Sequence, residues 1–197
     1  MKEVLHGLVN RAATGLLGSR IGVYNGVAVP DRAIFDANDH RPDYKCELVS
    51  AVRDAVEPGD RVTLVGGGRS VAAVHAARVG GEVTVIEAGR EAARLSSHVA
   101  ALNGTHFAVE YAVVGEAGAV AGEVSGYTID LTDLSGDVLV LDCEGAETDI
   151  LPVDVFETVI VETHPEHGAP ADAVIRDLDA AQVVGPDAIN GEVVVGE

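Results

Sequence analysis

Four ionisable side chains follow two apolar runs of the chain at the same spacing. Asp142 and Glu144 end one run, and Glu162 and His164 end the next. If both runs are strands, alternate residues share a face, so the two members of each pair project together. Acids crowded at a strand end raise one another's pKa and are poor choices for stability alone, which favours a functional role for Asp142 and Glu144. The nearby Glu147 is instead interpreted as an electrostatic cap of the following helix.

Proton removal is the chemistry that this group of side chains suits. An unperturbed histidine has a pKa of about 6.5, so we expect His164 to be mostly neutral near pH 7 and to act as the base, oriented by Glu162 or Asp142. A histidine before a proline is often only a turn residue, and this interpretation of His164 has equal weight. A divalent metal held by Asp142, Glu144, Glu162 and His164 is a further alternative with less weight, because no fixed ligand spacing enforces it. The prediction therefore includes no metal.

A glycine-rich turn lies upstream, between an apolar run and a helical segment. Gly66, Gly67 and Gly68 form this turn, and at such a turn backbone N–H groups come close to a ligand. The next apolar run ends in Glu87, where nucleoside-binding sheets place a carboxylate that accepts from both ribose hydroxyls. A purely structural turn is the alternative. The combination favours a nucleoside cofactor, contacted by the three glycines, Glu87 and Ala88.

The spacing after the first glycine argues against a dinucleotide. Nicotinamide-binding folds use G-x-G-x-x-G, whereas the six residues from Gly66 are Gly-Gly-Gly-Arg-Ser-Val. No glycine or alanine stands at the sixth position, so a nicotinamide-dependent oxidoreductase is the weaker alternative.

The elements that must position these residues alternate from residue 61 onward. Short apolar runs alternate with helical segments, which indicates an α/β fold with a doubly wound, mostly parallel sheet covered on both faces. Ligands of such sheets bind at the carboxyl ends of the strands. The last two strands are joined by only a few residues and should pair antiparallel. Strands are expected at 61–66, 82–87, 107–114, 137–143, 157–163, 181–185 and 191–196, and helices at 69–79, 90–102, about 145–151 and 169–180.

Residues 1–57 are expected to form an N-terminal extension packed on a core of residues 58–197, within a single compact domain. The extension either covers the crevice or joins two copies of the chain in a homodimer. Its expected elements are a helix over 2–17, a hairpin around Asn25-Gly26 and a helix over 43–57.

Composition narrows the partners and the compartment. The 197 residues include 32 acidic and 13 basic side chains, a net charge of −19. The basic footprint that binds phosphates is missing, so nucleic acid is not an expected partner. Only two of the basic residues are lysines; an acidic, lysine-poor surface suggests a halophilic, salt-adapted cytoplasm, with an ordinary acidic protein as the alternative.

The remaining sequence signals agree with a cytoplasmic protein. Cys46 and Cys143 lie far apart in apolar stretches and are expected to be buried thiols in a reducing compartment. The first 17 residues lack a signal-peptide core. No uninterrupted apolar run reaches 18 residues, so membrane insertion is not expected.

One segment carries a resemblance to a known family. Residues 142–147, Asp-Cys-Glu-Gly-Ala-Glu, are similar to the D-x-E-G-A-E segment of the FkbM-like methyltransferases, which are class I S-adenosylmethionine-dependent enzymes. The lead-in that ends in Asp130-Leu and the strand end Glu162-Thr-His164-Pro also resemble that family. The predicted antiparallel last strand is typical of the class I fold. The likeness covers about residues 44–197.

This resemblance implies the cofactor, the reaction and some site residues. It implies S-adenosylmethionine as cofactor and O-methylation of a hydroxyl on a small molecule, sugar or lipid-like precursor. Glu47 resembles a family glutamate and joins Asp142 among the cofactor residues, while Glu144 and His164 are assigned to the acceptor. Leu64 and Ser70 depart from the family motif. The alternative that they support is a non-catalytic cofactor-binding or interaction protein with a degenerate methyltransferase fold.

Overall fold

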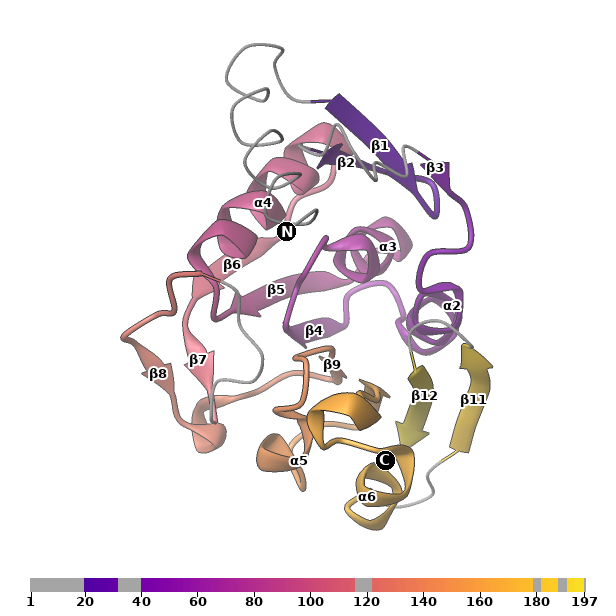
Figure 1. The fold of residues 1–197 in the computed structure, drawn as a ribbon, viewed down its shortest axis with the longest axis vertical. Coiled ribbons are helices and arrows are strands. Elements are labelled where there is room, and N and C mark those ends of the chain that lie inside the picture. Colours follow the sequence, from indigo (N-terminus) through magenta and orange to yellow (C-terminus); the bar gives the residue numbers. More distant parts are fainter. Residues whose placement is uncertain (1–19, 32–39, 116–121, 179–181, 188–190, 197) are drawn as a thin grey trace, which may run out of the picture.

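A seven-stranded sheet forms the centre of the protein (Figure 1). The computed structural model describes residues 20–31, 40–115, 122–178, 182–187 and 191–196, so the helix expected over 2–17 lies outside the described residues. Across the sheet the strand order is β11-β12-β10-β9-β4-β5-β6. The strands are β4 (Arg61–Val65), β5 (Glu82–Glu87), β6 (Ala108–Tyr111), β9 (Val138–Leu141), β10 (Thr158–Glu162), β11 (Gln182–Asp187) and β12 (Gly191–Gly196).

The pairing of these strands confirms the predicted fold class. β6, β5, β4, β9 and β10 run parallel to one another. The last strand, β12, pairs antiparallel with both β10 and β11. The sheet is therefore doubly wound and mostly parallel, with an antiparallel last strand.

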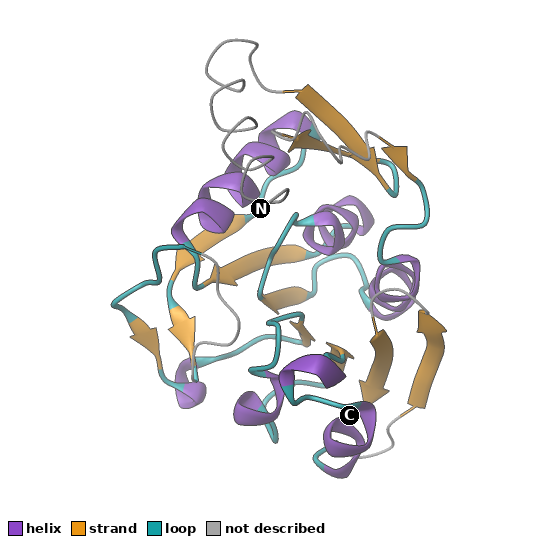
Figure 2. Cartoon of the chain, in the orientation of Figure 1, coloured by secondary structure: helices purple, strands orange, loops and turns teal. Residues whose placement is uncertain are grey.

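Alternate residues of the strands belong to two separate hydrophobic cores, one on each face of the sheet. Val138 and Val140 pack with the helices of one face, and Leu139 and Leu141 pack with those of the other, as the period of two in a strand requires. Figure 2 shows helices on both sides of the strands. The first face carries α2 (Cys46–Ala55), α3 (Val71–Val79) and α4 (Arg90–Leu102), and the second carries α5 (Glu147–Ile150) and α6 (Ala171–Arg176).

Several elements are shorter than the sequence predicts. The strand expected over 107–114 stops at Tyr111, and the chain continues as β7 (Val113–Val114), which pairs with β8 (Thr128–Ile129) instead of β5. The helix expected at 145–151 is the single turn of α5, because Leu151 precedes a proline and is disfavoured in a helix. No helix in the described part of the chain is long and apolar enough to cross a membrane.

The two cysteines differ in their surroundings. Neither of these two described residues is in a disulfide, and Cys46 is exposed at the start of α2 whereas Cys143 is half-buried. The prediction that both are buried is therefore wrong, most clearly for Cys46. The apolar side chains that follow Cys46 face the core from the next positions of α2, and the first position of the helix points away from it.

The predicted hairpin is present and packs on helices α3 and α4. β1 (Arg20–Tyr24) and β2 (Val27–Asp31) pair antiparallel around Asn25-Gly26, and β3 (His40–Arg41) pairs parallel with β1. Asn25 and Gly26 both have positive φ, which the favoured two-residue hairpin turn requires. The Asn103 amide at the end of α4 accepts from the N–H of Ala28 at 2.9 Å and donates to its carbonyl at 2.8 Å. A side chain 75 positions away in sequence therefore holds the hairpin.

We expect Asn103→Ala to loosen this hairpin. The substitution leaves both backbone groups of Ala28 without their partner, so the free energy of unfolding should fall by about 1–3 kcal/mol. Hydrogen exchange at the Ala28 amide should accelerate. Thr105→Ala, a change beyond the same helix end that removes only a bond to Ala100, should leave exchange at Ala28 unchanged. Equal exchange rates at Ala28 in all three proteins would show that Asn103 does not hold the hairpin.

Candidate functional site

The carboxyl ends of two neighbouring parallel strands, β9 and β10, bring the predicted acids and histidine together. β9 lies between β4 and β10. Asp142 follows β9, Glu162 ends β10, and His164 lies two residues beyond; all three are at least nine-tenths buried. Glu144 belongs to the same group but has half of its side chain exposed. Four side chains that the sequence placed at two strand ends therefore form one cluster.

A lysine that sequence analysis assigned no role lies between the two buried carboxylates. The Lys45 Nζ is 2.6 Å from Asp142 Oδ2 and also forms an ion pair with Glu162 Oε2. Burial alone would lower the pKa of Lys45. The two carboxylates have the larger combined effect, so the net pKa of Lys45 is raised. The signal in the sequence was indirect: buried acids at adjacent strand ends need a cation, and Lys45 is one of only two lysines.

Glu162 contacts Lys45 in this cluster. Burial and the nearby Asp142 raise the pKa of Glu162 to about 9, against the opposing effect of Lys45. Its carboxylate contacts the lysine rather than the imidazole of His164. Of the two acids expected to orient His164, Glu162 is engaged by Lys45 instead, and Asp142 faces the imidazole Nε2 at 3.8 Å without a hydrogen bond.

Glu147 orients the histidine. Its Oε1 lies 2.8 Å from His164 Nδ1, and the fully buried carboxylate also accepts from the N–H groups of Cys143 and Gly145 at 3.0 and 2.8 Å. Burial alone would raise the pKa of Glu147. The hydrogen bonds have the larger combined effect, so the net pKa of Glu147 is lowered. The ionised carboxylate can only accept, so Nδ1 carries the donated proton. Interpreting Glu147 as a helix cap missed its bond to His164.

The second ring nitrogen of His164 faces the other acids. His164 Nε2 lies 3.8 Å from Asp142 Oδ1 and 3.9 Å from Glu144 Oε2. Burial lowers the pKa of His164, but the combined effect of Glu147, Asp142 and Glu144 raises it to about 9. The imidazole is therefore mostly protonated at pH 7. The prediction of a mostly neutral His164 is wrong, because it took the unperturbed pKa of the side chain.

The glycine turn packs its first residue against the end of β9. A Cβ on Gly66, which has φ +83°, would lie 2.0 Å from the carbonyl oxygen of Asp142. A Cβ on Gly67 would lie 2.7 Å from the Val85 side chain. A Cβ on Gly68 would meet nothing within 4 Å. Gly66 and Gly67 thus allow close packing, and Gly68 is the glycine whose surroundings are open.

Glu87 lies next to this turn. Its Oε2 accepts from the N–H of Gly68 at 3.2 Å, and its Oε1 accepts from that of Gly89 at 3.0 Å. Each carboxylate oxygen keeps a second lone pair for a hydroxyl, so the arrangement fits a ribose. The carbonyl of the next residue, Ala88, accepts from the N–H of Ser125.

Glu47, the other predicted cofactor glutamate, is half-buried on α2, where its Oε2 contacts the Sγ of Cys46 at 2.9 Å. Glu87 is therefore hydrogen-bonded to the glycine turn, whereas the contact that the structure gives for the Glu47 side chain is with Cys46.

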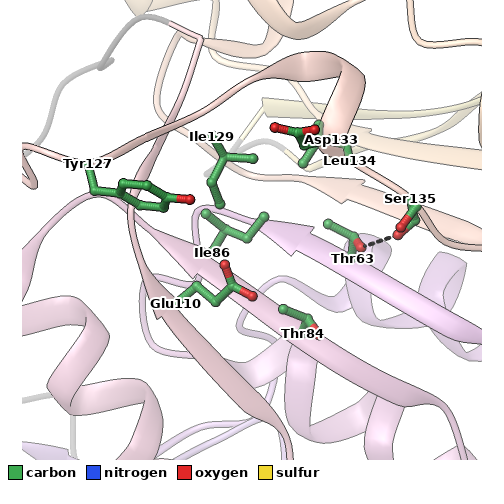
Figure 3. A pocket seen from close by; sticks show the side chains of 9 residues that line it. All are labelled: Thr63, Thr84, Ile86, Glu110, Tyr127, Ile129, Asp133, Leu134 and Ser135. Atoms are coloured by element: carbon green, nitrogen blue, oxygen red, sulfur yellow. Dashed lines mark hydrogen bonds between the residues drawn. The ribbon is translucent and has the colours of Figure 1, made fainter.

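A polar pocket lies apart from this cluster. It has a volume of about 350 Å³ on the face of β4, β5 and β6 (Figure 3). The Thr63 hydroxyl at its wall donates to the carbonyl of Ser135 at 2.9 Å. None of the predicted site residues lines it. Its lining residues are Thr63, Thr84, Ile86, Glu110, Tyr127, Ile129, Asp133, Leu134 and Ser135.

Several solved structures that are similar to this chain are methyltransferases. A ribosomal protein L11 methylase from Lactobacillus delbrueckii subsp. bulgaricus is 19% identical over 76% of this chain and 77% of that protein, with a TM-score of 0.52. A methyltransferase from Pyrococcus furiosus is 12% identical over 99% and 97%, with a TM-score of 0.56. A 16S rRNA methyltransferase from T. thermophilus, in complex with AdoMet and guanosine, is 13% identical over 91% of this chain, with a TM-score of 0.59.

These similarities show the Rossmann-like methyltransferase fold. This chain covers only 50% of the T. thermophilus enzyme. No protein-family model matches the chain, and no curated protein matches it either. The resemblance to the FkbM-like family therefore stays a prediction.

The raised pKa of His164 predicts a loss of stability with rising pH. The folded state holds the proton more tightly than the unfolded state, where the pKa is about 6.5. The stabilisation is therefore complete below pH 6.5 and is lost as the pH rises to about 9, a change on the order of 3 kcal/mol. Glu162, whose pKa is also raised, contributes in the same direction.

His164→Gln should remove the histidine's share of this decline. The measurement is the free energy of unfolding at pH 6 and at pH 9, by chemical denaturation. His98→Gln, the same substitution at an exposed position of α4, should keep the wild-type difference. If His164→Gln and wild type lose equal stability between the two pH values, the carboxylates do not hold a proton on His164.

Proposed function

We propose that the protein is an S-adenosylmethionine-dependent methyltransferase, similar to the FkbM-like family, that methylates a hydroxyl of a small molecule. The observation that carries the proposal is the placement of the cluster of Asp142, Glu147 and His164 beside the glycine turn and Glu87. The cluster and the glycine turn both lie at the carboxyl ends of adjacent strands, where ligands of open α/β sheets bind. The fold is that of methyltransferases, one of which was solved with AdoMet.

The chain's own residues supply the contacts for the cofactor. Glu87 is placed to accept from the ribose hydroxyls, and the open side of Gly68 leaves room for a ligand against the backbone. When bound, the cofactor supplies an electrophilic methyl group on a sulfonium. Asp142 lies at the end of the neighbouring strand, with its carbonyl against Gly66. The cofactor is thereby proposed to span β4, β5 and β9.

His164 is the proposed base for the acceptor hydroxyl. In the proposed transfer the bound cofactor would give its methyl group to the acceptor oxygen and keep the electron pair on sulfur, and His164 Nε2 would take the hydroxyl proton. Glu147 keeps the proton on Nδ1 and directs Nε2 toward the cluster. Because the pKa of His164 is raised to about 9, the imidazole that accepts this proton becomes the major form only above about pH 9.

The charge of the chain favours a small acceptor over RNA. Some of the proteins with this fold methylate RNA, but a net charge of −19 opposes binding of a polyanion. A sugar or lipid-like hydroxyl compound without charge fits the acidic crevice better. The same acidic, lysine-poor composition supports a salt-adapted cytoplasmic protein, so each titration should be run at both low and high salt.

The second candidate function is non-catalytic cofactor binding. Leu64 and Ser70 favour it, since they stand where the family motif has an acid and a glycine. Ser70 nevertheless adopts the left-handed conformation typical of glycine, with φ +56°. Its hydroxyl bonds to Ser96 on α4 at 2.7 Å. The backbone of the turn thus keeps its shape without the third glycine, which favours the catalytic proposal.

Cofactor binding is the first expected outcome. Isothermal titration with S-adenosylhomocysteine should show one site per chain, and NAD should not bind. Glu87→Ala should weaken binding about 10- to 150-fold, because a charge-assisted hydrogen bond contributes about 1.5–3 kcal/mol. Glu91→Ala, at an exposed acid of α4, should bind like wild type. Binding of NAD alone would refute the cofactor assignment.

Methyl transfer is expected to depend on His164. In protein treated with EDTA and assayed with a pool of hydroxylated acceptors, His164→Ala should lower transfer about 10²-fold or more while S-adenosylhomocysteine affinity stays nearly constant. The wild-type kcat/KM should rise with pH and reach half of its plateau near pH 9, because only the deprotonated imidazole accepts the proton. A rate that is half-maximal near pH 6.5, or that is unaffected by the substitution, would mean that another group takes the proton.

A further inference from the structure

We propose that Asp142, Glu144 and His164 form a binding site for a divalent transition-metal ion such as Mn²⁺ or Zn²⁺. Each of the three side chains offers one ligand atom, and these atoms all lie within 4.8 Å of one another. Metal–ligand bonds of about 2.1 Å bring neighbouring ligands to about 3 Å from one another. The partly exposed Glu144 side chain has room to make this adjustment.

The orientation of His164 is an independent observation that supports a ligand here. Its side chain is nine-tenths buried and aims Nε2 at the two carboxylates. Among the described residues, Nε2 has these ionic neighbours at 3.8 and 3.9 Å but no hydrogen-bond partner. The other nitrogen, Nδ1, is held by the fully buried Glu147. A carboxylate behind an imidazole in this way fixes the ring of a metal-binding histidine.

The surrounding contacts decide which side chains are ligands. Asp142 uses Oδ2 for Lys45 and keeps Oδ1 on the side of His164. Glu162 is engaged by Lys45 and is not part of the group of three. The four-ligand set considered from the sequence is thereby reduced to two carboxylates and one imidazole.

The donor set indicates the class of ion. Imidazole suits Zn²⁺, Fe²⁺ and related transition metals, and carboxylates suit Mn²⁺, whereas Mg²⁺ and Ca²⁺ are bound mainly by oxygen. Three protein ligands leave coordination positions open for water or an exogenous oxygen.

The ion would lie where the acceptor hydroxyl is proposed to bind. An ion at Nε2 excludes a proton there, so it would replace His164 as the group that activates the hydroxyl. This role rests on the proposed function. The existence of the binding site rests only on the three side chains and Glu147.

Binding of the metal alone tests the site. Isothermal titration of EDTA-treated full-length protein with MnCl₂ and with ZnCl₂, at moderate salt, should give one site per chain. Glu144→Gln keeps the shape of an exposed side chain and should weaken binding at least tenfold. Glu147→Gln should weaken it about 10- to 100-fold, the effect of losing the partner of a ligating histidine. Glu157→Gln, at an exposed acid before the amino end of β10, should bind like wild type.

Paramagnetic broadening locates the ion. Substoichiometric Mn²⁺ should broaden the imidazole NMR signals of His164 and His167, whose rings lie 6.3 Å apart. Two results would overturn the proposal: equal binding by Glu144→Gln and Glu157→Gln, or only weak binding at many sites, as expected of adventitious ions on a chain of charge −19.

Titrating S-adenosylhomocysteine into the same samples tests cofactor binding, and with it the proposed function, separately from metal binding. Loss of metal binding with retained cofactor binding rejects only the metal site. A chain that binds the metal but not the cofactor rejects only the methyltransferase proposal.

Discussion

The burial of two acids at neighbouring strand ends is the constraint on which the site depends. Asp142 and Glu162 are both buried and contact the same lysine, in surroundings where unpaired charges would cost several kcal/mol each. Lys45 contacts both carboxylates, and it stands at the start of α2. The helix, and the hairpin that precedes it in the chain, are thereby tied to the carboxyl edge of the sheet. The crevice thus depends on residues that lie before the first strand of the sheet.

The D-x-E-G-A-E segment can be explained position by position from the contacts around it. Asp142 meets Lys45, and Glu144 points into the half-exposed part of the cluster. Gly145 has φ +107°, and a Cβ there would lie 2.7 Å from His167, so only glycine fits. Glu147 is buried and holds His164. The segment therefore packs the end of β9 against the turn after β10 and fixes the direction of the imidazole.

The N-terminal hairpin is also joined to the glycine turn by aromatic contacts. The Arg69 guanidinium lies 4.6 Å from the ring centroid of Tyr24, and Tyr24 packs edge-on against Tyr44 at 5.3 Å. Lys45 follows Tyr44 directly. These contacts connect the turn beside Glu87 with the cation between Asp142 and Glu162. The predicted cofactor and acceptor regions are thus held by one continuous set of side chains.

The sequence alone determined the sheet, its antiparallel last strand, the hairpin, and the convergence of Asp142, Glu144, Glu162 and His164. These features depend on short-range patterns: the period of two in a strand, turn residues, and the rule that parallel strands end at the same edge. Only the tertiary structure decided which charges meet. Lys45 lies 97 and 117 positions from its two partners, and Glu147, on the helix after β9, contacts His164, which follows β10. The pKa of His164 follows from those distances and from burial, neither of which a local pattern encodes, so the sequence located the group while the packing set its protonation.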